Sequence, residues 1–293
     1  ALNVRGECAS REELARWGQN SVEHLHWSVE AMKVGFVDTL QYCGDPASGA
    51  VPSAELLSAP YAKARAASLS PGRAHAPEPG SPELWAGPDT VYFCVADGEG
   101  NACSFINSNY DGFGTGIVPR DVAGDGAGLG FTIQNRGHNF ILQEGHVNCV
   151  GPGKRPYHTI IPGMATVEAS GELHSAFGVM GGFMQPQGHL QVISAMEDFG
   201  LDPQAALDAP RWCIEGVGSE KGAGCIKGAP VAVEHGMPQA AVEGLRARGH
   251  DVREVCGLGR TVFGRGQVIY RDPSSGVLWG GCDPRSDGCA LGF

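Results

Sequence analysis

The residue of this chain best suited to nucleophilic chemistry is Thr90. It opens a run of strand-forming residues, TVYFCVAD (90–97), directly after a segment rich in proline and glycine. Cutting the chain between Asp89 and Thr90 would free an α-amine whose pKa, about 7.7–8.0, lets it accept the proton of the same residue's hydroxyl. A flexible segment before the strand would give that cut the exposed setting it needs. The alternative interpretation is an ordinary threonine that begins a strand.

Two glycines could supply the other half of the same chemistry. Gly181 and Gly182 lie between a predicted strand and a predicted helix. Backbone N–H groups near a helix N-terminus, with no Cβ in the way, can bind an oxyanion that develops when a carbonyl is attacked. The pair therefore predicts an oxyanion hole, and its simpler interpretation is a turn.

Other polar motifs point less directly to chemistry. The segments HNF (138–140) and KRPYHT (154–159) contain histidines, which serve structure more often than catalysis, and His158 is a candidate for contact with a substrate. The sequence has neither a Ser-His-Asp arrangement nor HExxH spacing. The glycine-rich AGDGAGLG (123–130) lacks the GK[ST] of a phosphate loop and the βαβ context of a dinucleotide fingerprint, which argues against nucleotide binding.

The ten cysteines do not predict a metal site, because the chain has no CxxC pair. Several lie within apolar strand patterns such as YFCV and NACSF, where a buried thiol behaves as a small hydrophobic side chain. The cysteine pattern decides neither disulfide pairing nor the compartment, so localisation is left open.

Composition restricts the class of protein. The 293 residues include 21 Lys and Arg against 32 Asp and Glu, a net charge of −11, which disfavours binding to the phosphates of nucleic acids. With 42% hydrophobic and 18% charged residues, the chain has a sizeable core to bury. No apolar run reaches the roughly 18 residues that a transmembrane helix needs. The sequence therefore predicts a globular fold with no nucleic-acid partner and no membrane span.

The elements that would position these residues begin with helices. Ser10 and Glu13 form a capping-box pattern, and Ser21 opens a second run with apolar residues at helical spacing. Residues 52–69 predict one or two short helices. Between 71 and 89, five prolines and three glycines exclude a helix or a central strand and predict an exposed, mobile linker.

After the linker the pattern changes to strands. Residues 90–97 and 101–109 flank Gly98-Glu99-Gly100, which predicts a hairpin. Further strands are predicted near 130, from 163, from 173, and over 266–272 and 276–281, with helices over about 185–199, 203–210 and 238–249. Mostly antiparallel strands with helices grouped between them predict an α+β layered sandwich.

Several long motifs resemble one family. The segment GPDTVYFCVADGEGNACSFINSNYDGFGTGIVP resembles the start of the small subunit of γ-glutamyltransferases, the N-terminal-nucleophile family also called glutathione hydrolases. Three further motifs follow in the family's order: PGKRPYHTIIPGM, GVMGGFMQPQGHLQVISAMEDFGLDPQAALDAPRW and DPSSGVLWGGCDPRSDG. Near the start, WGQNSVEHLHWSVEAMKVGFVDTLQYCGDP resembles the last helices of the large subunit. The resemblance covers nearly the whole chain.

This resemblance implies a fold and a mechanism. Family members are made as one precursor, cut themselves before a threonine and adopt a four-layer αββα sandwich. The new N-terminal threonine attacks a γ-glutamyl amide to form an acyl-enzyme, and water or an amino acid then takes the acyl group. By motif, Thr90 matches that nucleophile and Ser108 matches a threonine that hydrogen-bonds it. Gly181 and Gly182 match the oxyanion glycines, and no metal or organic cofactor is implied.

The resemblance also divides the chain into three parts. Residues 1–70 match the last helices of the large subunit, 71–89 the linker that ends at the cleavage site, and 90–293 the small, catalytic subunit. Most of the large subunit, with an arginine that grips the substrate's α-carboxylate, is expected upstream of Ala1. The chain is therefore expected to be a fragment with a sandwich incomplete at its N-terminus, and its partner is the upstream segment of the same precursor.

The positions that would recognise the acyl group depart from the family pattern. Family members hold the substrate's α-amino group with an Asn, a Gln or Glu, and an Asp, and the matching residues here are Tyr110, Arg136 and Asn139. A Ser-Ser pair that meets the α-carboxylate is replaced by His158-Thr159. Losing the Asp removes the charge that would pair with an ammonium group. These substitutions resemble a glutathione-hydrolase-like branch related to cephalosporin acylases.

Three functions are therefore compared. The preferred one is an autoprocessed hydrolase or acyltransferase that cleaves γ-glutamyl compounds such as glutathione. The first alternative is an acylase for other dicarboxylate-type amides, which shares the mechanism and differs in the pocket. The second is a non-catalytic relic that keeps the fold without processing. The sequence leaves the acyl acceptor and the oligomeric state open.

Overall fold

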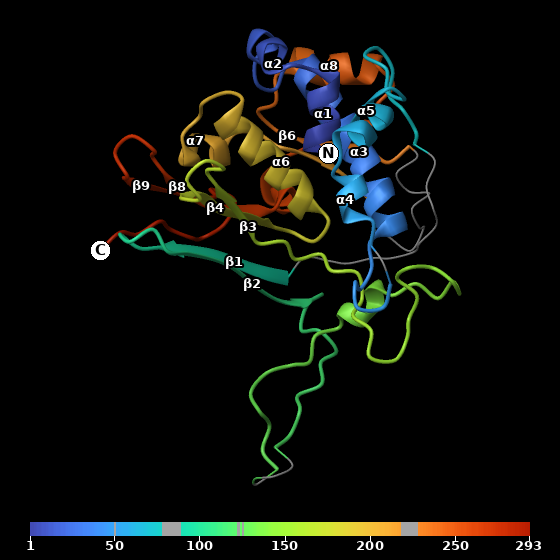
Figure 1. Cartoon of the computed structure of the whole chain (residues 1–293), viewed down its shortest axis with the longest axis vertical. Coiled ribbons are helices and arrows are strands. Elements are labelled where there is room, and N and C mark those ends of the chain that lie inside the picture. Colours follow the sequence, from blue (N-terminus) through green and yellow to red (C-terminus); the bar gives the residue numbers. More distant parts are fainter. Residues whose placement is uncertain (50, 78–88, 122–123, 125, 218–227) are drawn as a thin grey trace.

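Three stacked layers form the centre of the molecule (Figure 1). The computed structural model describes residues 1–49, 51–77, 89–121, 124, 126–217 and 228–293. The first layer is the hairpin of β1 (Asp89–Ala96) and β2 (Ala102–Tyr110). The second is a sheet of order β3-β4-β8-β9, formed by Gly163–Thr166, Leu173–Met180, Arg265–Arg271 and Leu278–Cys282. Helices α6 (Met184–Glu197) and α7 (Pro203–Asp208) form the third layer, on the sheet face turned away from the hairpin.

The hairpin packs on the four-stranded sheet through alternate side chains of β1. Thr90 and Tyr92 are buried, whereas Val91 is 62% and Phe93 45% exposed, because successive residues of a strand point to opposite faces. Gly178 of β4 makes room for the ring of Tyr92, since a Cβ at that position would lie 2.4 Å from the ring. The inner face of the hairpin therefore carries Thr90, and its apolar outer face is open to solvent.

A second core lies between a smaller sheet and the long helix α3 (Val22–Tyr42). In this sheet, of order β5-β6-β7, Trp212–Ile214 runs antiparallel and Val252–Val255 parallel to Val231–Glu234. Buried side chains of α3, α6, this sheet and α8 (Gln239–Ala247) form one cluster, which includes Leu25, Val29, Phe183, Trp212, Val231 and Leu245. The segments on the two sides of the Asp89–Thr90 bond thus share one hydrophobic core.

Local capping fixes where several helices begin. Ser10 and Glu13 form the predicted capping box of α2 (Arg11–Trp17), and the Ser21 side chain caps α3. Asp202 caps α7, which has Pro203 in its first turn. The remaining helices of the first part are α1 (Leu2–Cys8), α4 (Ser53–Leu56) and α5 (Ala59–Ala66). The predicted helices, the hairpin and the strands at 163, 173 and the end of the chain are confirmed.

Two parts of the strand prediction are wrong. The segment near 130 forms no strand but one side of an extended arm, residues 111–121 and 126–134, which projects from the body (Figure 1). The described residues of the two sides of the arm form scattered hydrogen bonds rather than a regular ladder, such as the one from Ile133 N–H to Ile117 O at 3.0 Å. The sheet β5-β6-β7 is absent from the prediction, because its strands of three or four residues are too short to show a period.

The predicted linker is packed where it begins. The N–H of Ala74 donates to the Arg248 carbonyl at 2.6 Å, and the N–H of His75 donates to Glu30 Oε2 at 2.8 Å. Residues 71–73 and 76 are exposed as predicted, whereas Ala74 and His75 are half-buried and Pro77 is buried, so this part of the linker lies against the body. The mobility predicted for 78–88 concerns residues outside the described part of the chain. Of the helices that are described, none is long and apolar enough to cross a membrane.

Candidate active site

Thr90 lies at the buried start of β1, directly opposite Ser108 of β2. Their Oγ atoms are 2.9 Å apart, a hydrogen-bond distance at which either hydroxyl can donate. Both residues line a cavity of about 670 Å³, whose other described lining residues are Val91, Asn107, Asn109, Gly112, Phe131, Thr132, Met180 and Arg265. The hairpin therefore gives the Thr90 hydroxyl a fixed partner at the wall of a cavity.

A β-bulge sits beside this pair of hydroxyls. The pairing of β1 with β2 changes from Asp89↔Tyr110 to Thr90↔Ser108, so that Asn109 is the extra residue. Tyr110 has φ +80°, a left-handed conformation that costs a residue with a side chain about 1–3 kcal/mol. Its N–H donates to Ser108 Oγ at 3.0 Å. The bulge thus orients the Ser108 hydroxyl. It also places Tyr110, which follows it, between the Thr90–Ser108 pair and the other residues predicted to contact the substrate.

Tyr110, Arg136, Asn139 and Thr159, predicted to contact the substrate, are joined in one network. The Tyr110 hydroxyl donates to Asn139 Oδ1, and the guanidinium carbon of Arg136 lies 5.0 Å from the centre of the Tyr110 ring. Arg136 Nη1 donates to Thr159 Oγ1 at 2.6 Å. Asn139 is also held by the carbonyl of Tyr157, to which its Nδ2 donates at 2.9 Å.

Burial sets the protonation of this network. Desolvation raises the pKa of Tyr110 to about 12, although the nearby Arg136 opposes the shift, so the phenol stays neutral. Arg136 is itself buried, and its Nη2 has no hydrogen-bond partner among the residues described. Desolvation, followed by the charges of Arg136 and Arg155, lowers the pKa of His158. The network therefore carries one positive charge and favours an anion over a second cation.

Gly181 and Gly182 follow β4 immediately after Met180, a lining residue of the Thr90 cavity. Their φ angles of +143° and +58° suit glycine, and a Cβ on Gly181 would lie 3.1 Å from the Cα of Gly264. Both carbonyl oxygens accept hydrogen bonds from the first turn of α6. Neither glycine N–H finds an acceptor within the described residues. Unpaired N–H groups at this position are what an oxyanion hole requires.

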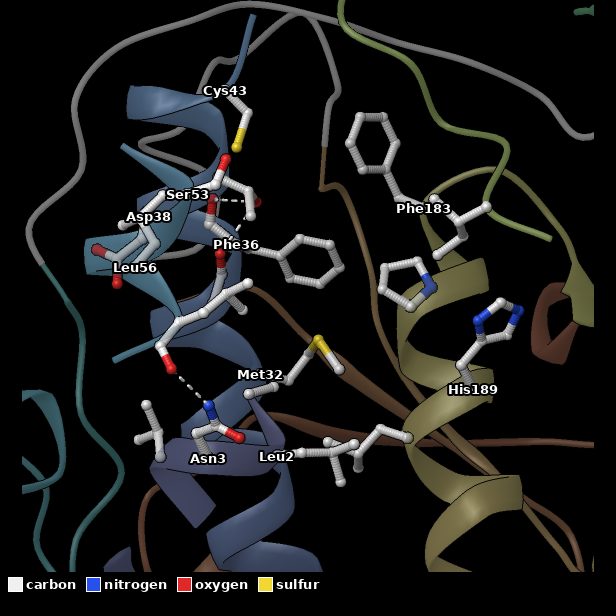
Figure 2. Close-up of a pocket in the computed structure, with 18 of the residues that line it drawn as sticks. Leu2, Asn3, Met32, Phe36, Asp38, Cys43, Ser53, Leu56, Phe183 and His189 are labelled. Atoms are coloured by element: carbon white, nitrogen blue, oxygen red, sulfur yellow. Dashed lines mark hydrogen bonds between the residues drawn. The ribbon is translucent and has the colours of Figure 1, made fainter. Parts of the chain in front are cut away.

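His158, Thr159 and Gly182 also line a second cavity, of about 620 Å³. Figure 2 shows this cavity between the N-terminal helices and α6, with Phe36 and Phe183 on its opposite walls. Thr90 is not among its described lining residues. The predicted site residues therefore form two groups, one around Thr90 and one around Thr159, which the Ser108–Tyr110 contact connects.

Arg265 belongs to the Thr90 cavity and is not among the residues predicted from the sequence. It is the first residue of β8 and pairs with Met180 of β4. From the sequence alone, its motif GRGQVIY is typical of the start of an ordinary strand and does not mark the arginine as a site residue. Only the pairing of β4 with β8, residues 85 positions apart, brings Arg265 to the cavity.

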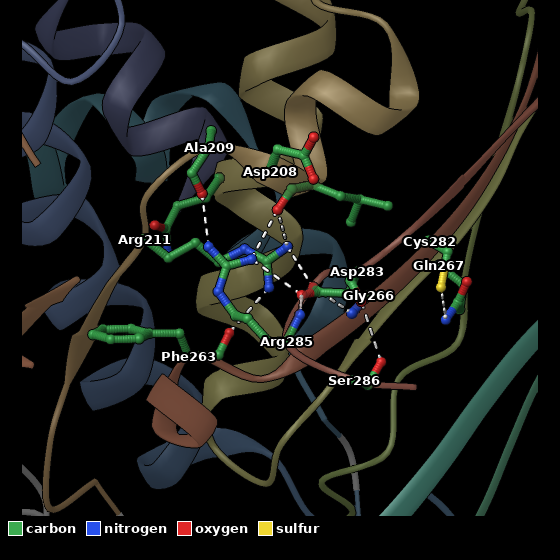
Figure 3. Close-up of polar contacts among 12 residues, drawn as sticks. Asp208, Ala209, Arg211, Phe263, Gly266, Gln267, Cys282, Asp283, Arg285 and Ser286 are labelled. Atoms are coloured by element: carbon green, nitrogen blue, oxygen red, sulfur yellow. Dashed lines mark hydrogen bonds and ion pairs between the residues drawn. The ribbon is translucent and has the colours of Figure 1, made fainter. Parts of the chain in front are cut away.

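A buried ionic network fixes the backbone next to Arg265 (Figure 3). Asp283 Oδ2 accepts the N–H of Gly266 at 2.7 Å and lies 2.8 Å from Arg211 Nη2. Asp283 Oδ1 lies 3.1 Å from Arg285 Nη1, and Arg285 also pairs with the buried Glu234. The network ties the start of β8 to the motif DPRSDG near the end of the chain. Over the described part of the chain, no cluster of three or more His, Cys, Asp or Glu could hold a metal ion.

Comparison with solved structures identifies the class of fold. The chain superposes on a cephalosporin acylase from Bacillus halodurans with a TM-score of 0.79 and 43% sequence identity, over 98% of this chain and 48% of that one. The match confirms the predicted α+β sandwich of the N-terminal-nucleophile type, of which this chain matches about half.

The family follows from the sequence. The family model described as gamma-glutamyltranspeptidase matches residues 1–293, and the chain belongs to this family. It is 38% identical to the glutathione hydrolase-like YwrD proenzyme of Bacillus subtilis over 273 residues, 93% of this chain and 48% of that protein. It is 31% identical to the oxamate amidohydrolase proenzyme of Klebsiella pneumoniae, over 94% of this chain and 48% of that protein. The chain thus spans about half the length of these curated relatives.

Proposed function

We propose that this chain supplies the catalytic threonine of a self-cleaving amide hydrolase or acyltransferase. The observation that carries the proposal is the buried Thr90 hydroxyl, 2.9 Å from Ser108 Oγ at the wall of a cavity. Thr90 is the nucleophile and, once its α-amine is free, its own base. Ser108 supports the hydroxyl, and Gly181 and Gly182 bind the oxyanion.

The proposed reaction begins with cleavage of the Asp89–Thr90 bond. The free α-amine of Thr90 takes the hydroxyl proton while Oγ1 forms a bond to the amide carbon of the substrate. The tetrahedral oxyanion accepts hydrogen bonds from the glycine N–H groups. When it collapses, the C–N bond breaks and the α-amine returns its proton to the leaving amine. Water or an amino acid then attacks the ester on Thr90 and releases the acyl group.

The test is to follow processing of the full-length precursor. Its mass and N-terminal sequences are measured during incubation, beside a Thr90→Ala variant. We expect a fragment that begins at Thr90 to appear in the wild type and to be missing in the variant. A wild-type precursor that stays intact under native conditions, with no acyl-enzyme after substrate is added, would favour the non-catalytic relic and overturn the proposal.

The acyl donors that we propose first are γ-glutamyl compounds such as glutathione, in line with the glutathione hydrolases among the relatives. A second candidate is an amide of another dicarboxylic acid. It is favoured by the buried cation Arg136 at the position where the family pattern has a Gln or Glu, because this charge repels an ammonium group. The name of the oxamate amidohydrolase points to a substrate of that kind in one relative, because oxamate is the monoamide of a dicarboxylic acid. A parallel screen of glutathione, γ-glutamyl anilides and glutaryl amides separates the two.

The proposed partner is the upstream large-subunit segment of the same precursor. The outer face of the hairpin presents Val91, Phe93, Val95 and Phe105 to solvent, an apolar surface that a further layer would cover. In the full-length precursor, Phe93→Asp is expected to lower the yield of folded protein severalfold. Leu258→Asp, at a side chain 95% exposed and outside this face, is the control. Equal yields of the two variants would contradict the proposed contact.

A further inference from the structure

Arg265 lines the cavity of the proposed nucleophile, and no carboxylate of the described residues pairs with it. Among the described residues its one hydrogen-bond partner is the thioether sulfur of Met180, 3.8 Å from Nη1, and a thioether is a weak acceptor. The side chain is half-buried, so water hydrates its charge only in part. It is also the one charged residue in the described lining of the cavity. The guanidinium thus has unused donors in a polar cavity.

Strand alternation directs Arg265 toward Thr90. Its neighbour Gly266 faces α7, because a Cβ there would lie 2.6 Å from Leu207 Cδ2. Arg265 therefore faces the other way, toward the hairpin. Met180, its partner on β4, lies two residues after Gly178, the glycine that receives the Tyr92 ring.

The alternation of side chains along β1 also turns the proposed nucleophile, Thr90, toward the face of the four-stranded sheet that carries Arg265. Thr90 precedes Tyr92 by two residues and so shares the inner face of the hairpin. Side chains of Thr90, Met180 and Arg265 consequently line one cavity between the two layers.

The backbone that carries Arg265 is held in place. Gly266 donates its N–H to Asp283 Oδ2 at 2.7 Å, and its carbonyl accepts the Asp283 N–H at 3.0 Å. Asp283 is in turn paired with Arg211 and Arg285. A charged group mounted on a rigid backbone loses little entropy when it binds a ligand.

We propose that Arg265 binds a carboxylate of the substrate's acyl group, and that it makes the cavity select amides of acids with a second carboxylate. The inference rests on the proposed role of Thr90. A guanidinium binds a carboxylate with two parallel hydrogen bonds, which would replace the weak contact with Met180. Both γ-glutamyl and glutaryl groups carry such a carboxylate, whereas a butyryl group, which is a glutaryl group with its terminal carboxylate replaced by hydrogen, does not. The residue is a specificity determinant within this chain, additional to any arginine of an upstream segment.

The test compares acyl groups on the processed full-length enzyme. Glutaryl, γ-glutamyl and butyryl p-nitroanilides are hydrolysed by the wild type, Arg265→Gln, Arg265→Lys and the control Arg271→Gln. Arg271 is on the same strand but pairs with Glu172 at 3.4 Å, away from the cavity lining. We expect Arg265→Gln to lower the ratio of kcat/KM for glutaryl to that for butyryl about 10- to 100-fold, mainly through KM. Arg265→Lys should restore part of the ratio because it keeps the charge, and Arg271→Gln should preserve it.

Two results would overturn the inference. One is an equal loss of activity on all three anilides, which would indicate a structural role for Arg265. The other is an unchanged ratio in Arg265→Gln.

Binding of glutarate, measured by calorimetry, separates this inference from the proposed function. If the precursor never cleaves and hydrolyses no anilide, the proposed function fails. Glutarate binding that Arg265→Gln weakens at least tenfold would still support the carboxylate site. Failure of glutarate to bind the wild type, or equal binding to both proteins, would overturn it.

Discussion

Two sets of arginines in this molecule have opposite surroundings. Arg211 and Arg285 are buried against carboxylates, both of them contacting Asp283 within 3.1 Å (Figure 3). Arg136 and Arg265, near the proposed active site, have no carboxylate partner within the described ranges. Both sets keep a buried donor without a partner among the described residues, Nε of Arg211 and Nη2 of Arg136, so the difference lies in the carboxylates: the charges of the first set are paired within the fold, and those of the second are not.

The presence or absence of a carboxylate partner distinguishes arginines that stabilise the fold from arginines that are available to bind a ligand. Removing a cation from water costs several kcal/mol unless a counter-charge is fixed beside it. Arg211 and Arg285 meet that condition through Asp283, so their charges hold elements together. Arg136 meets it only in part, through a hydroxyl and an aromatic ring. A charge kept without a partner suggests that the partner arrives with the substrate.

The largest expected effect comes from breaking the paired set. Asp283→Ala leaves two buried guanidinium groups without their shared carboxylate and removes the acceptor of the Gly266 N–H. We expect the free energy of unfolding to fall by about 3–5 kcal/mol. The measurement is urea denaturation of the full-length precursor in a Thr90→Ala background, where the protein stays one chain.

The control for this variant is an ion pair at the surface. Glu215→Ala breaks the contact with Arg253, whose side chain is 55% exposed, and should cost about 0–1 kcal/mol. If Asp283→Ala costs no more than Glu215→Ala, the paired set does not hold the fold together and the comparison is wrong.

A smaller effect on stability is expected at a buried histidine, where the same cost of burying an unpaired charge applies. Desolvation lowers the pKa of His189 to about 4, below the roughly 6.5 of an unfolded chain. Between these two values the unfolded state binds more protons, so the free energy of unfolding falls as the pH drops from 6.5 toward 4. His189→Leu should reduce the loss of stability between pH 7 and pH 5 by about 2 kcal/mol. Urea denaturation at the two pH values measures it.

The matched variant here is His138→Leu, because His138 is exposed. It should keep the pH dependence of the parent protein. An unchanged pH dependence in His189→Leu would mean that burial does not keep this histidine neutral.

The smallest expected change in stability comes from the unpaired set. Arg136→Met removes a buried charge together with its hydrogen bond to Thr159, and the two effects oppose each other. We expect the free energy of unfolding to change by less than about 1 kcal/mol. The rate ratio of γ-glutamyl to glutaryl anilide should rise severalfold, because the charge that repels an ammonium is gone. A large loss of stability with no change in that ratio would place Arg136 in the structural set.

Much of the fold could be predicted because its signals are local. The caps at Ser10, Ser21 and Asp202 act within one helical turn, and the hairpin is specified by two alternating runs and a glycine turn. The segment near 130 has the same strand-forming residues but no regular partner strand. It forms part of the arm instead, because pairing decides what a strand-like sequence becomes.

The candidate site was predictable in part. Motif positions predicted that Ser108 hydrogen-bonds Thr90, and the structure has their Oγ atoms 2.9 Å apart. They assigned Tyr110, Arg136 and Asn139 to one part of the substrate, and the structure joins these residues in one network. The sequence could not show which arginines are paired. The partners of Arg211 and Arg285 at Asp283 and Glu234 lie up to 72 positions away, and only the assembled sheets reveal that Arg265 faces a cavity.

The core shared by α3 and the small sheet has a consequence for the order of folding and chain cleavage. Before a cut at Asp89–Thr90, one continuous chain brings Leu25 and Trp212 together, and refolding is unimolecular. After the cut these residues belong to two molecules, so reassembly depends on protein concentration and dilution makes unfolding one-way. A processed protein would therefore owe its persistence to slow unfolding rather than to ready refolding. If the proposed cut occurs, folding would have to be complete before it.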